Sequence, residues 1–118
     1  MSSQMTPLQT QEQFEKLLKP IYENGKPAPE AVIVYFTAAW CGACKRIDFD
    51  SLLSSTPKTL VWYKCDVDEN KYTLGYCGLT KLPSFALIKD GKFFGKFSSS
   101  DTLTIFDNLK MAFFDSVV

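Results

Sequence analysis

The strongest signal in this sequence is the stretch at positions 34–45, which reads Val-Tyr-Phe-Thr-Ala-Ala-Trp-Cys-Gly-Ala-Cys-Lys. It begins within the apolar, largely β-branched run Ala31–Phe36, which is typical of a strand buried on both faces of a sheet. It ends in Cys41-Gly42-Ala43-Cys44, where the chain is expected to leave the strand and begin a helix. Thiols at this spacing in a first helical turn approach closely enough to form a disulfide, and the free N–H groups there favour a thiolate. The stretch therefore predicts a redox-active cysteine pair at the end of a buried strand.

The residues that follow the cysteines complete a strand–helix–strand unit. A second apolar run, Thr59–Cys65, predicts another buried strand, and Cys44–Leu53 between the two runs predicts a helix. Three apolar side chains of that helix are expected to face inward: Ile47, Leu52 and Leu53. Because a crossover helix at this spacing joins parallel strands, the two predicted strands should run parallel to each other.

Capping residues and apolar spacing predict three further helices. Thr10-x-x-Gln13 is a capping-box pattern, and the helix that it begins would carry four apolar residues at helical spacing: Phe14, Leu17, Leu18 and Ile21. A short helix is expected over Asn70–Tyr76. Ser100 or Asp101 can cap a last helix, and its apolar stripe would consist of Leu103, Phe106, Leu109 and Phe113.

The remaining strands form a hairpin. Ser84–Lys89 and Lys92–Phe97 lie on either side of Asp90-Gly91, which is the dipeptide that a tight hairpin turn favours. The elements together predict an α/β fold, with a central mixed β-sheet and helices on both faces, in a single domain over residues 1–118. Five aromatic side chains are expected in its core: Trp62, Phe85, Phe93, Phe97 and Phe106.

Charge and composition exclude several classes of function. The 13 basic and 13 acidic residues cancel, which argues against an electrostatic grip on nucleic acid and provides no polybasic membrane anchor. The sequence contains no histidine, which excludes Cys-His and Ser-His-Asp catalysis as well as histidine-ligated metals. We therefore expect a protein that binds neither nucleic acid nor membrane and holds no metal.

The distribution of apolar residues and cysteines predicts a cytoplasmic protein. Residues 1–13 are polar and lack the basic and apolar regions of a signal peptide, and the longest apolar run, Ala31–Phe36, is too short to span a bilayer. Four cysteines are too few for a disulfide framework, so the thiols are expected to serve chemistry in a reducing compartment.

Residues 34–45 resemble the active-site segment of thioredoxins. The likeness continues through Lys64–Asn70, Gly78–Phe85 and Lys89–Lys92 in the order of that family, and it covers about residues 8–114. The resemblance implies a thioredoxin fold and a protein-disulfide reductase with no bound cofactor, whose redox-active disulfide is Cys41–Cys44. It also implies electron transport and cell redox homeostasis, with disulfide-containing client proteins and thioredoxin reductase, or an equivalent electron donor, as partners of a monomer.

The resemblance assigns roles residue by residue. Cys41 would be the attacking thiolate, and Cys44 would be the buried resolving thiol. Five residues would shape the site: Trp40, Gly42, Ala43, Tyr35 and Lys64. Four would bind substrate, two of them through a cis peptide bond between Leu82 and Pro83: Trp40, Leu82, Pro83 and Ser99.

Four positions depart from the family pattern. Ala43 replaces a proline and frees an N–H, which predicts a less reducing pair. Tyr35 replaces a buried aspartate; a phenol is a poor base near pH 7, so activation of Cys44 would depend on Lys64, water or the mixed disulfide itself. Phe49 replaces a helix-kinking proline, which predicts a straighter helix. Ser99 replaces a glycine, which predicts a narrower range of clients.

Several alternatives stay open from the sequence. Cys65 and Cys77 could complete a four-thiolate zinc site with the active-site pair, although Cys65 lies in the middle of a predicted strand. Otherwise Cys65 is expected to be a small core residue, and Cys77 is either inert or a regulatory thiol open to oxidation. The dithiol itself could act as an oxidant or isomerase, or it could belong to a partner-binding or redox-regulatory module with weak turnover.

Overall fold

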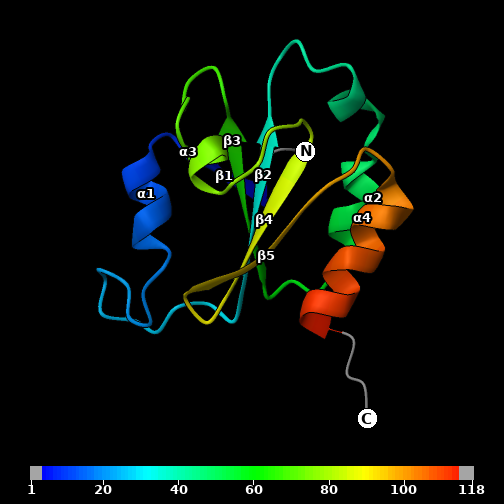
Figure 1. Cartoon of the computed structure of the whole chain (residues 1–118). Coiled ribbons are helices and arrows are strands. Elements are labelled where there is room, and N and C mark those ends of the chain that lie inside the picture. Colours follow the sequence, from blue (N-terminus) through cyan, green and yellow to red (C-terminus); the bar gives the residue numbers. More distant parts are fainter. Residues whose placement is uncertain (1–3, 115–118) are drawn as a thin grey trace.

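A five-stranded sheet forms the centre of the protein in a computed structural model, which describes residues 4–114 (Figure 1). The strand order is β1-β3-β2-β4-β5. The strands are β1 (Met5–Pro7), β2 (Ala31–Thr37), β3 (Leu60–Asp66), β4 (Ser84–Lys89) and β5 (Lys92–Ser98). The helical segments are α1 (Gln11–Lys16), η2 (Ala43–Arg46), α2 (Phe49–Ser55), α3 (Thr73–Tyr76), α4 (Thr102–Leu109) and the π-helical turn η3 (Lys110–Phe114).

Strand β2 occupies the middle of the sheet and is buried along its whole length. It runs parallel to β3, with Ala31 opposite Leu60 and Thr37 opposite Asp66, and antiparallel to β4. Because strands cover both of its edges and helices cover both of its faces, an unbroken apolar sequence is stable there. The predicted buried strand and its parallel partner are confirmed.

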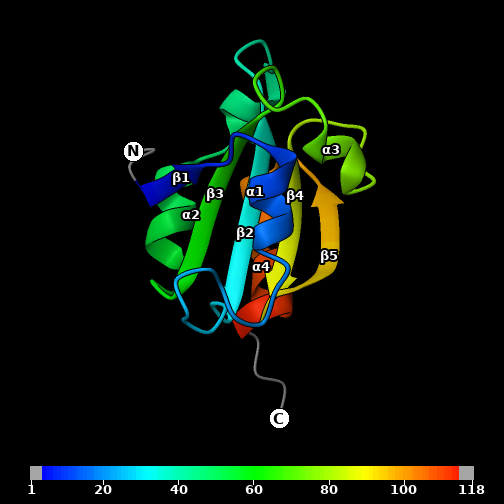
Figure 2. The same cartoon turned by 90° about the vertical axis from the view of Figure 1, so that its left-hand side faces the viewer.

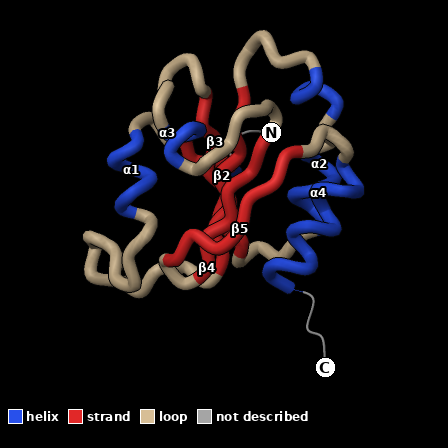
Figure 3. The backbone as a smooth tube through the Cα atoms, viewed as in Figure 1, coloured by secondary structure: helices blue, strands red, loops and turns tan. Residues whose placement is uncertain are grey.

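Helices cover both faces of the sheet, which confirms the predicted mixed α/β architecture (Figures 1 and 3). Helices α2 and α4 lie on one face, whereas α1 and α3 lie on the other, where Figure 2 shows α1 in front of the central strands. Each face buries its own apolar cluster. The cluster beneath α2 and α4 contains Cys41 and Cys44, and the cluster beneath α1 and α3 contains Cys65 and Cys77.

The helix predicted over Cys44–Leu53 is divided into two. Ile47 has an extended backbone (ψ 128°), and Asp48 caps a new helix by accepting a hydrogen bond from the Ser51 N–H at 3.1 Å. The Asp48 N–H donates to the Thr102 hydroxyl at 3.0 Å, so the start of α4 holds the interruption in place.

The expectation of a straighter helix, drawn from Phe49 in place of proline, is therefore wrong. A capping aspartate and a bond to a neighbouring helix interrupt the segment without any proline. The inward positions are nevertheless correct, since three apolar side chains are buried as predicted: Ile47, Leu52 and Leu53.

The ends of the described chain differ most from the sequence prediction. Strand β1, which pairs with β3 in parallel, was hidden within a polar segment. Helix α1 ends at Lys16, and Ile21 beyond it is 54% exposed rather than part of an inward helix face. In α4 the buried residues are Ile105 and Leu109; Leu109 is buried as predicted, whereas Leu103 is 72% exposed. Phe93, expected in the core, is exposed because β5 is an edge strand.

The hairpin and the last cap follow the predicted turn chemistry. Asp90 and Gly91 both have positive φ values, 52° and 78°, which is the backbone of the primed turn that joins two twisted strands. Asp101 rather than Ser100 caps α4, and its carboxylate accepts a hydrogen bond from the Thr104 N–H at 3.0 Å.

Candidate active site

Cys41 and Cys44 are joined by a disulfide just beyond the end of β2. Their Cα atoms lie 5.4 Å apart, within the usual range for a bridged pair. Cys41 lies in the loop before η2, Cys44 lies within η2, and only 5% and 6% of their surfaces are exposed. The predicted pair therefore forms, at the carboxyl end of a central strand, where α/β sheets expose their working residues.

A backbone N–H is directed at the sulfur of Cys41. The Cys44 amide donates to Cys41 Sγ, with nitrogen and sulfur 3.1 Å apart. Segment η2 has only four residues, so a single short turn takes the place of the helix terminus expected from the sequence. The donor recorded is the amide of Cys44 and not the amide of Ala43 that proline would have removed. Since N–H donors stabilise a thiolate, this amide favours ionisation of Cys41 after reduction.

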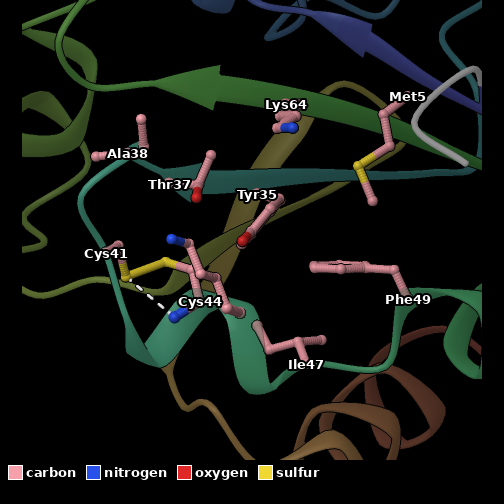
Figure 4. A pocket seen from close by; sticks show the side chains of 11 residues that line it. Met5, Tyr35, Thr37, Ala38, Cys41, Cys44, Ile47, Phe49 and Lys64 are labelled. Atoms are coloured by element: carbon pink, nitrogen blue, oxygen red, sulfur yellow. Dashed lines mark hydrogen bonds between the residues drawn. A yellow bond between two sulfur atoms is a disulfide. The ribbon is translucent and has the colours of Figure 1, made fainter.

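Tyr35 lies beneath the disulfide within a stack of aromatic rings. Its ring centroid is 4.6 Å from that of Phe49 and 5.3 Å from that of Phe85. Figure 4 shows its hydroxyl end directed toward Cys44. Burial raises the pKa of Tyr35, and a hydrogen bond with Thr37 acts in the opposite direction. Tyr35 therefore stays protonated at neutral pH and offers a hydroxyl, not a base, to the cysteines.

A cavity of about 420 Å³ lies behind the disulfide (Figure 4). Its lining includes both cysteines, the hydroxyl-bearing Tyr35 and Thr37, and an apolar wall made of Met5, Ala38, Ala39, Ile47 and Phe49. Among the described residues, two charged side chains belong to the lining: Lys45 and Lys64. Lys64 lies opposite Tyr35 in the β2–β3 register, and both residues line the cavity behind the pair.

The predicted substrate residues gather at the same end of the sheet. Phe36 lies opposite Ser84 in the β2–β4 ladder, and Ser84 lies opposite Ser98 in the β4–β5 ladder. Pro83 and Ser99 stand one residue beyond these pairs, level with the end of β2. The Leu82–Pro83 peptide bond is cis, as the resemblance implied.

The tryptophan beside the disulfide is exposed to solvent. Trp40 is 69% exposed, and its Nε1 donates to the Asp68 carboxylate at 2.9 Å. Gly42 is also exposed, while Ala43 and Leu82 are partly covered and Pro83 is buried. The structure thus brings Trp40, the disulfide and the loop that ends in cis Pro83 to one end of the molecule.

Comparisons with known proteins agree with this geometry. Residues 6–111 match the family model described as Thioredoxin. The chain belongs to the thioredoxin family. It is 31% identical to mitochondrial thioredoxin-3 of Saccharomyces cerevisiae over 90% of this chain and 78% of that relative, and 43% identical to thioredoxin 1 of Plasmodium falciparum over 63% of this chain and 66% of that one.

Solved thioredoxins share the fold. The crystal structure of Saccharomyces cerevisiae thioredoxin 3 in its oxidised form has a TM-score of 0.74 and 28% identity, covering 91% of this chain and 94% of that one. The structure of Fasciola hepatica thioredoxin gives a TM-score of 0.73, also at 28% identity, covering 91% and 98%.

Family membership and the closed cysteine pair establish the chemistry of this thioredoxin-family protein. It is a dithiol–disulfide oxidoreductase that works with its own cysteine pair and needs no bound cofactor. Thioredoxins act on disulfide-containing substrates and are reduced by thioredoxin reductase.

No helix within residues 4–114 is long and apolar enough to cross a bilayer.

The other two cysteines of this thioredoxin lie on the opposite face of the sheet. Cys65 is fully buried, and Cys77 is 2% exposed. Burial raises the pKa of both thiols to about 12; the nearby Cys77 and Asp66 add to the rise at Cys65, while Lys96 opposes the rise at Cys77. The prediction for Cys65 is confirmed.

This placement argues against the other interpretations of the four cysteines. A regulatory Cys77 would need an accessible thiolate, which burial disfavours. In the part of the chain that the structure describes, no three potential metal ligands gather, and the sheet separates the two cysteine pairs. A four-thiolate zinc site is therefore incompatible with this fold.

Sequence reasoning missed several contributors to the site of this thioredoxin. Met5 reaches the cavity from β1, a strand that the polar N-terminal sequence concealed. Asp68 is absent from the residues predicted for the site, yet its carboxylate accepts the hydrogen bond from the indole N–H of Trp40. The hydroxyls of Ser84 and Ser98 bond across the hairpin at 2.6 Å beside the cis proline. The sequence signal for this last contact was the pair of serines at matching positions of two strands joined in a hairpin.

Proposed function

We propose that the protein reduces protein disulfides with Cys41 as the attacking thiol and Cys44 as the resolving thiol. The Cys41 thiolate attacks one sulfur of a client disulfide, forms a mixed disulfide and expels the other client sulfur as a thiolate. The Cys44 thiolate then attacks Cys41 Sγ, which closes the Cys41–Cys44 bond and releases the second client thiolate. Two electrons pass to the client, whose thiolates take up two protons.

The observation that carries this proposal is the closed Cys41–Cys44 disulfide at the carboxyl end of β2 in a chain of the thioredoxin family. The amide donor at Cys41 supports the order of attack, because the thiol that is stabilised as a thiolate is the better nucleophile and leaving group. Gly42 and Ala43 carry no bulky side chain, which leaves the loop between the two sulfurs open.

Client proteins would bind over the end of the sheet. Trp40 provides an exposed aromatic surface fixed by Asp68, and the strand register puts the Leu82–Pro83 peptide and Ser99 at the same end of the sheet. An extended client segment can bond to backbone groups at such a strand end. The side chain of Ser99, where glycine is usual in the family, narrows the range of clients that fit.

Among residues 4–114, no carboxylate lines the cavity behind Cys44 to act as a base for resolution. Tyr35 occupies that place and stays protonated, so Lys64, water or the departing mixed disulfide would assist Cys44. We therefore infer a resolving step that is slower than in thioredoxins with a buried aspartate.

We assign the protein a place in cytoplasmic electron transport and redox homeostasis as a monomeric, single domain over residues 1–118. The four-cysteine composition, which suits a reducing compartment, supports this placement, and thioredoxin reductase or an equivalent donor would supply the electrons. A mitochondrial location is the alternative, since one relative is a mitochondrial thioredoxin.

A second candidate function is partner binding with weak turnover. The buried phenol of Tyr35 in place of a base favours it, because slow resolution prolongs the mixed disulfide with a client. The exposed Trp40 surface is common to both functions.

The test is reduction of insulin disulfides with NADPH and thioredoxin reductase as the electron source. Cys41→Ser is expected to abolish turnover, and Cys44→Ser is expected to trap a mixed disulfide on Cys41, visible by mass spectrometry. Cys65→Ala, on the other face of the sheet, is the matched control and should keep turnover within about twofold of wild type. A wild-type protein that forms mixed disulfides without turnover would establish the binding function instead.

A further inference from the structure

The cavity behind the disulfide carries chemistry that protein-disulfide reduction does not use. Its volume of about 420 Å³ falls within the range of small-molecule sites. In the proposed function, protein clients would bind the exposed side of the pair beside Trp40, whereas this cavity lies on the inner side, among Tyr35, Phe49 and Lys64. Both cysteines of the redox pair form part of its wall.

The charges of the lining select the kind of ligand. Within the part of the chain that the structure describes, Lys45 and Lys64 are the charged side chains of the lining, and no carboxylate belongs to it. Neither lysine takes part in the ion pair recorded for residues 4–114, which joins Lys16 to Glu23. The hydroxyls of Tyr35 and Thr37 add hydrogen-bond donors near the sulfurs. Cationic and hydroxyl donors around an apolar wall favour a small anion with an aliphatic stem.

The position of Cys44 determines which sulfur such a ligand reaches. Figure 4 shows Cys44 between Cys41 and Tyr35, on the side of the pair that faces the cavity. The other sulfur, Cys41 Sγ, accepts a hydrogen bond from the Cys44 N–H, with nitrogen and sulfur 3.1 Å apart. A negative charge that develops on Cys41 is therefore stabilised. Attack from the cavity on Cys44 therefore has a stabilised leaving group.

We propose that this cavity binds a small thiol that carries a carboxylate and lets it exchange with the disulfide through Cys44. The inference rests on the proposed redox cycling of the pair and extends it to a second class of substrate. The bound thiolate attacks Cys44 Sγ, the Cys41–Cys44 bond breaks, and Cys41 leaves as a thiolate. A second molecule of the same thiol attacks the ligand sulfur of the mixed disulfide and releases Cys44 as a thiolate. Two small thiols become one small disulfide, and the cysteine pair gains the two electrons.

The charge of the ligand can be tested separately from its reactivity. The reverse exchange is followed in the reduced Cys41→Ser protein, with dithiodipropionate as the anionic disulfide probe and cystamine as the cationic probe. Intact mass spectrometry gives the rate at which each probe forms a mixed disulfide with Cys44. The ratio of the two rates is compared between variants, because the intrinsic reactivity of each probe then cancels.

Lys64→Gln in the Cys41→Ser background is expected to lower the anionic-to-cationic rate ratio about threefold, the value of one exposed charge pair. Lys89→Gln is the matched control, since Lys89 pairs with Ala31 at the far end of the sheet and should leave the ratio unchanged. In the Cys44→Ser protein, where Cys41 reacts, Lys64→Gln and Lys89→Gln should give the same ratio.

Three results would overturn the proposal. In the first, Lys64→Gln and Lys89→Gln lower the anionic-to-cationic rate ratio equally. In the second, Lys64→Gln lowers the ratio only where Cys41 is the reacting thiol. In the third, Cys44 forms a mixed disulfide with neither probe. Insulin reduction by the wild-type protein is measured in parallel. The result of the insulin assay does not depend on the small-thiol proposal, because clients that bind beside Trp40 do not need the cavity.

Discussion

Each face of the sheet holds two of the four cysteines, and the two faces give them different chemistry. The pair beneath α2 and α4 lies beyond the end of β2, forms a disulfide and borders a cavity. The pair beneath α1 and α3 consists of Cys65 within β3 and Cys77 after α3, and both remain free and buried. The residue type is the same, so the reactivity of a thiol here depends on its place in the fold.

The physical cause is desolvation. A thiol in the middle of a covered strand loses the water that would stabilise its thiolate, and no donor replaces that water. At the end of a strand, the chain turns, backbone amides become free, and one of them points at Cys41. Four predictions test this contrast between the two faces.

The largest expected difference is in thiol labelling of the native protein. After mild reduction of the Cys41–Cys44 pair, iodoacetamide at neutral pH should modify Cys41 about a thousandfold faster than Cys65 or Cys77. The reason is that a pKa near 12 leaves almost no thiolate on Cys65 or Cys77, whereas the Cys44 N–H favours ionisation of Cys41. Peptide mapping after timed quenching measures the rates.

The denatured protein is the control for labelling, because all four cysteines should then react alike. Labelling of native Cys77 at a rate near that of Cys41 would contradict the contrast and restore a regulatory role for Cys77.

The second prediction concerns stability at alkaline pH. The unfolded chain releases the Cys65 and Cys77 protons above the ordinary pKa of 9.0, whereas the folded protein keeps them until about pH 12. The folded state therefore binds more protons in this window, so the free energy of unfolding should fall as pH rises. Each thiol contributes a loss of about 1.4 kcal/mol per pH unit.

Urea titrations of the oxidised protein between pH 9.0 and about 12 measure this slope. Cys65→Ala and Cys77→Ala should each make the slope shallower by one thiol's contribution. Tyr22, whose burial also raises its pKa to about 12, contributes equally in all three proteins and cancels in the comparison. Identical slopes in the wild type and both variants would show that the two thiols are not desolvated.

The third prediction concerns the residue beneath the disulfide. Tyr35→Asp should raise the rate of insulin reduction about tenfold or more, because a carboxylate can take the proton of Cys44 and a buried phenol cannot. Turnover at saturating reductase measures the effect. Tyr35→Phe is the control; it keeps the stack against Phe49 and Phe85 and should react at the wild-type rate. A large loss in Tyr35→Phe would mean that the hydroxyl itself assists the reaction.

The smallest expected effect is at the loop between the cysteines. Ala43→Pro should lower the reduction potential of the pair by roughly 20 mV, since a stiffer loop favours the oxidised form. Equilibration with glutathione, followed by mass spectrometry, measures the shift. Gly75→Ala, in α3 on the other face with open space around its Cα, is the control and should leave the potential unchanged. An unchanged potential in Ala43→Pro would contradict the prediction that alanine in place of proline makes the pair less reducing.

Local sequence patterns predicted those parts of the fold that depend on neighbouring residues. The apolar run of β2, the Asp90-Gly91 turn and the cap at Thr10 each depend on residues close in the chain, and all three appear as expected. The parts that failed depend on distant residues. The interruption before α2 needs Thr102, and burial of Ile105 instead of Leu103 depends on how α4 is rotated against the sheet.

The sequence by itself determined that a cysteine pair follows a buried strand, because strand burial and the spacing of two thiols are properties of adjacent residues. Only the tertiary structure decided that Met5, Tyr35 and Lys64 would enclose a cavity behind that pair, since these residues come from three strands brought together by parallel register. It also decided which cysteines stay inert. Burial on a given face depends on the packing of the whole sheet, and no short stretch of sequence contains that information.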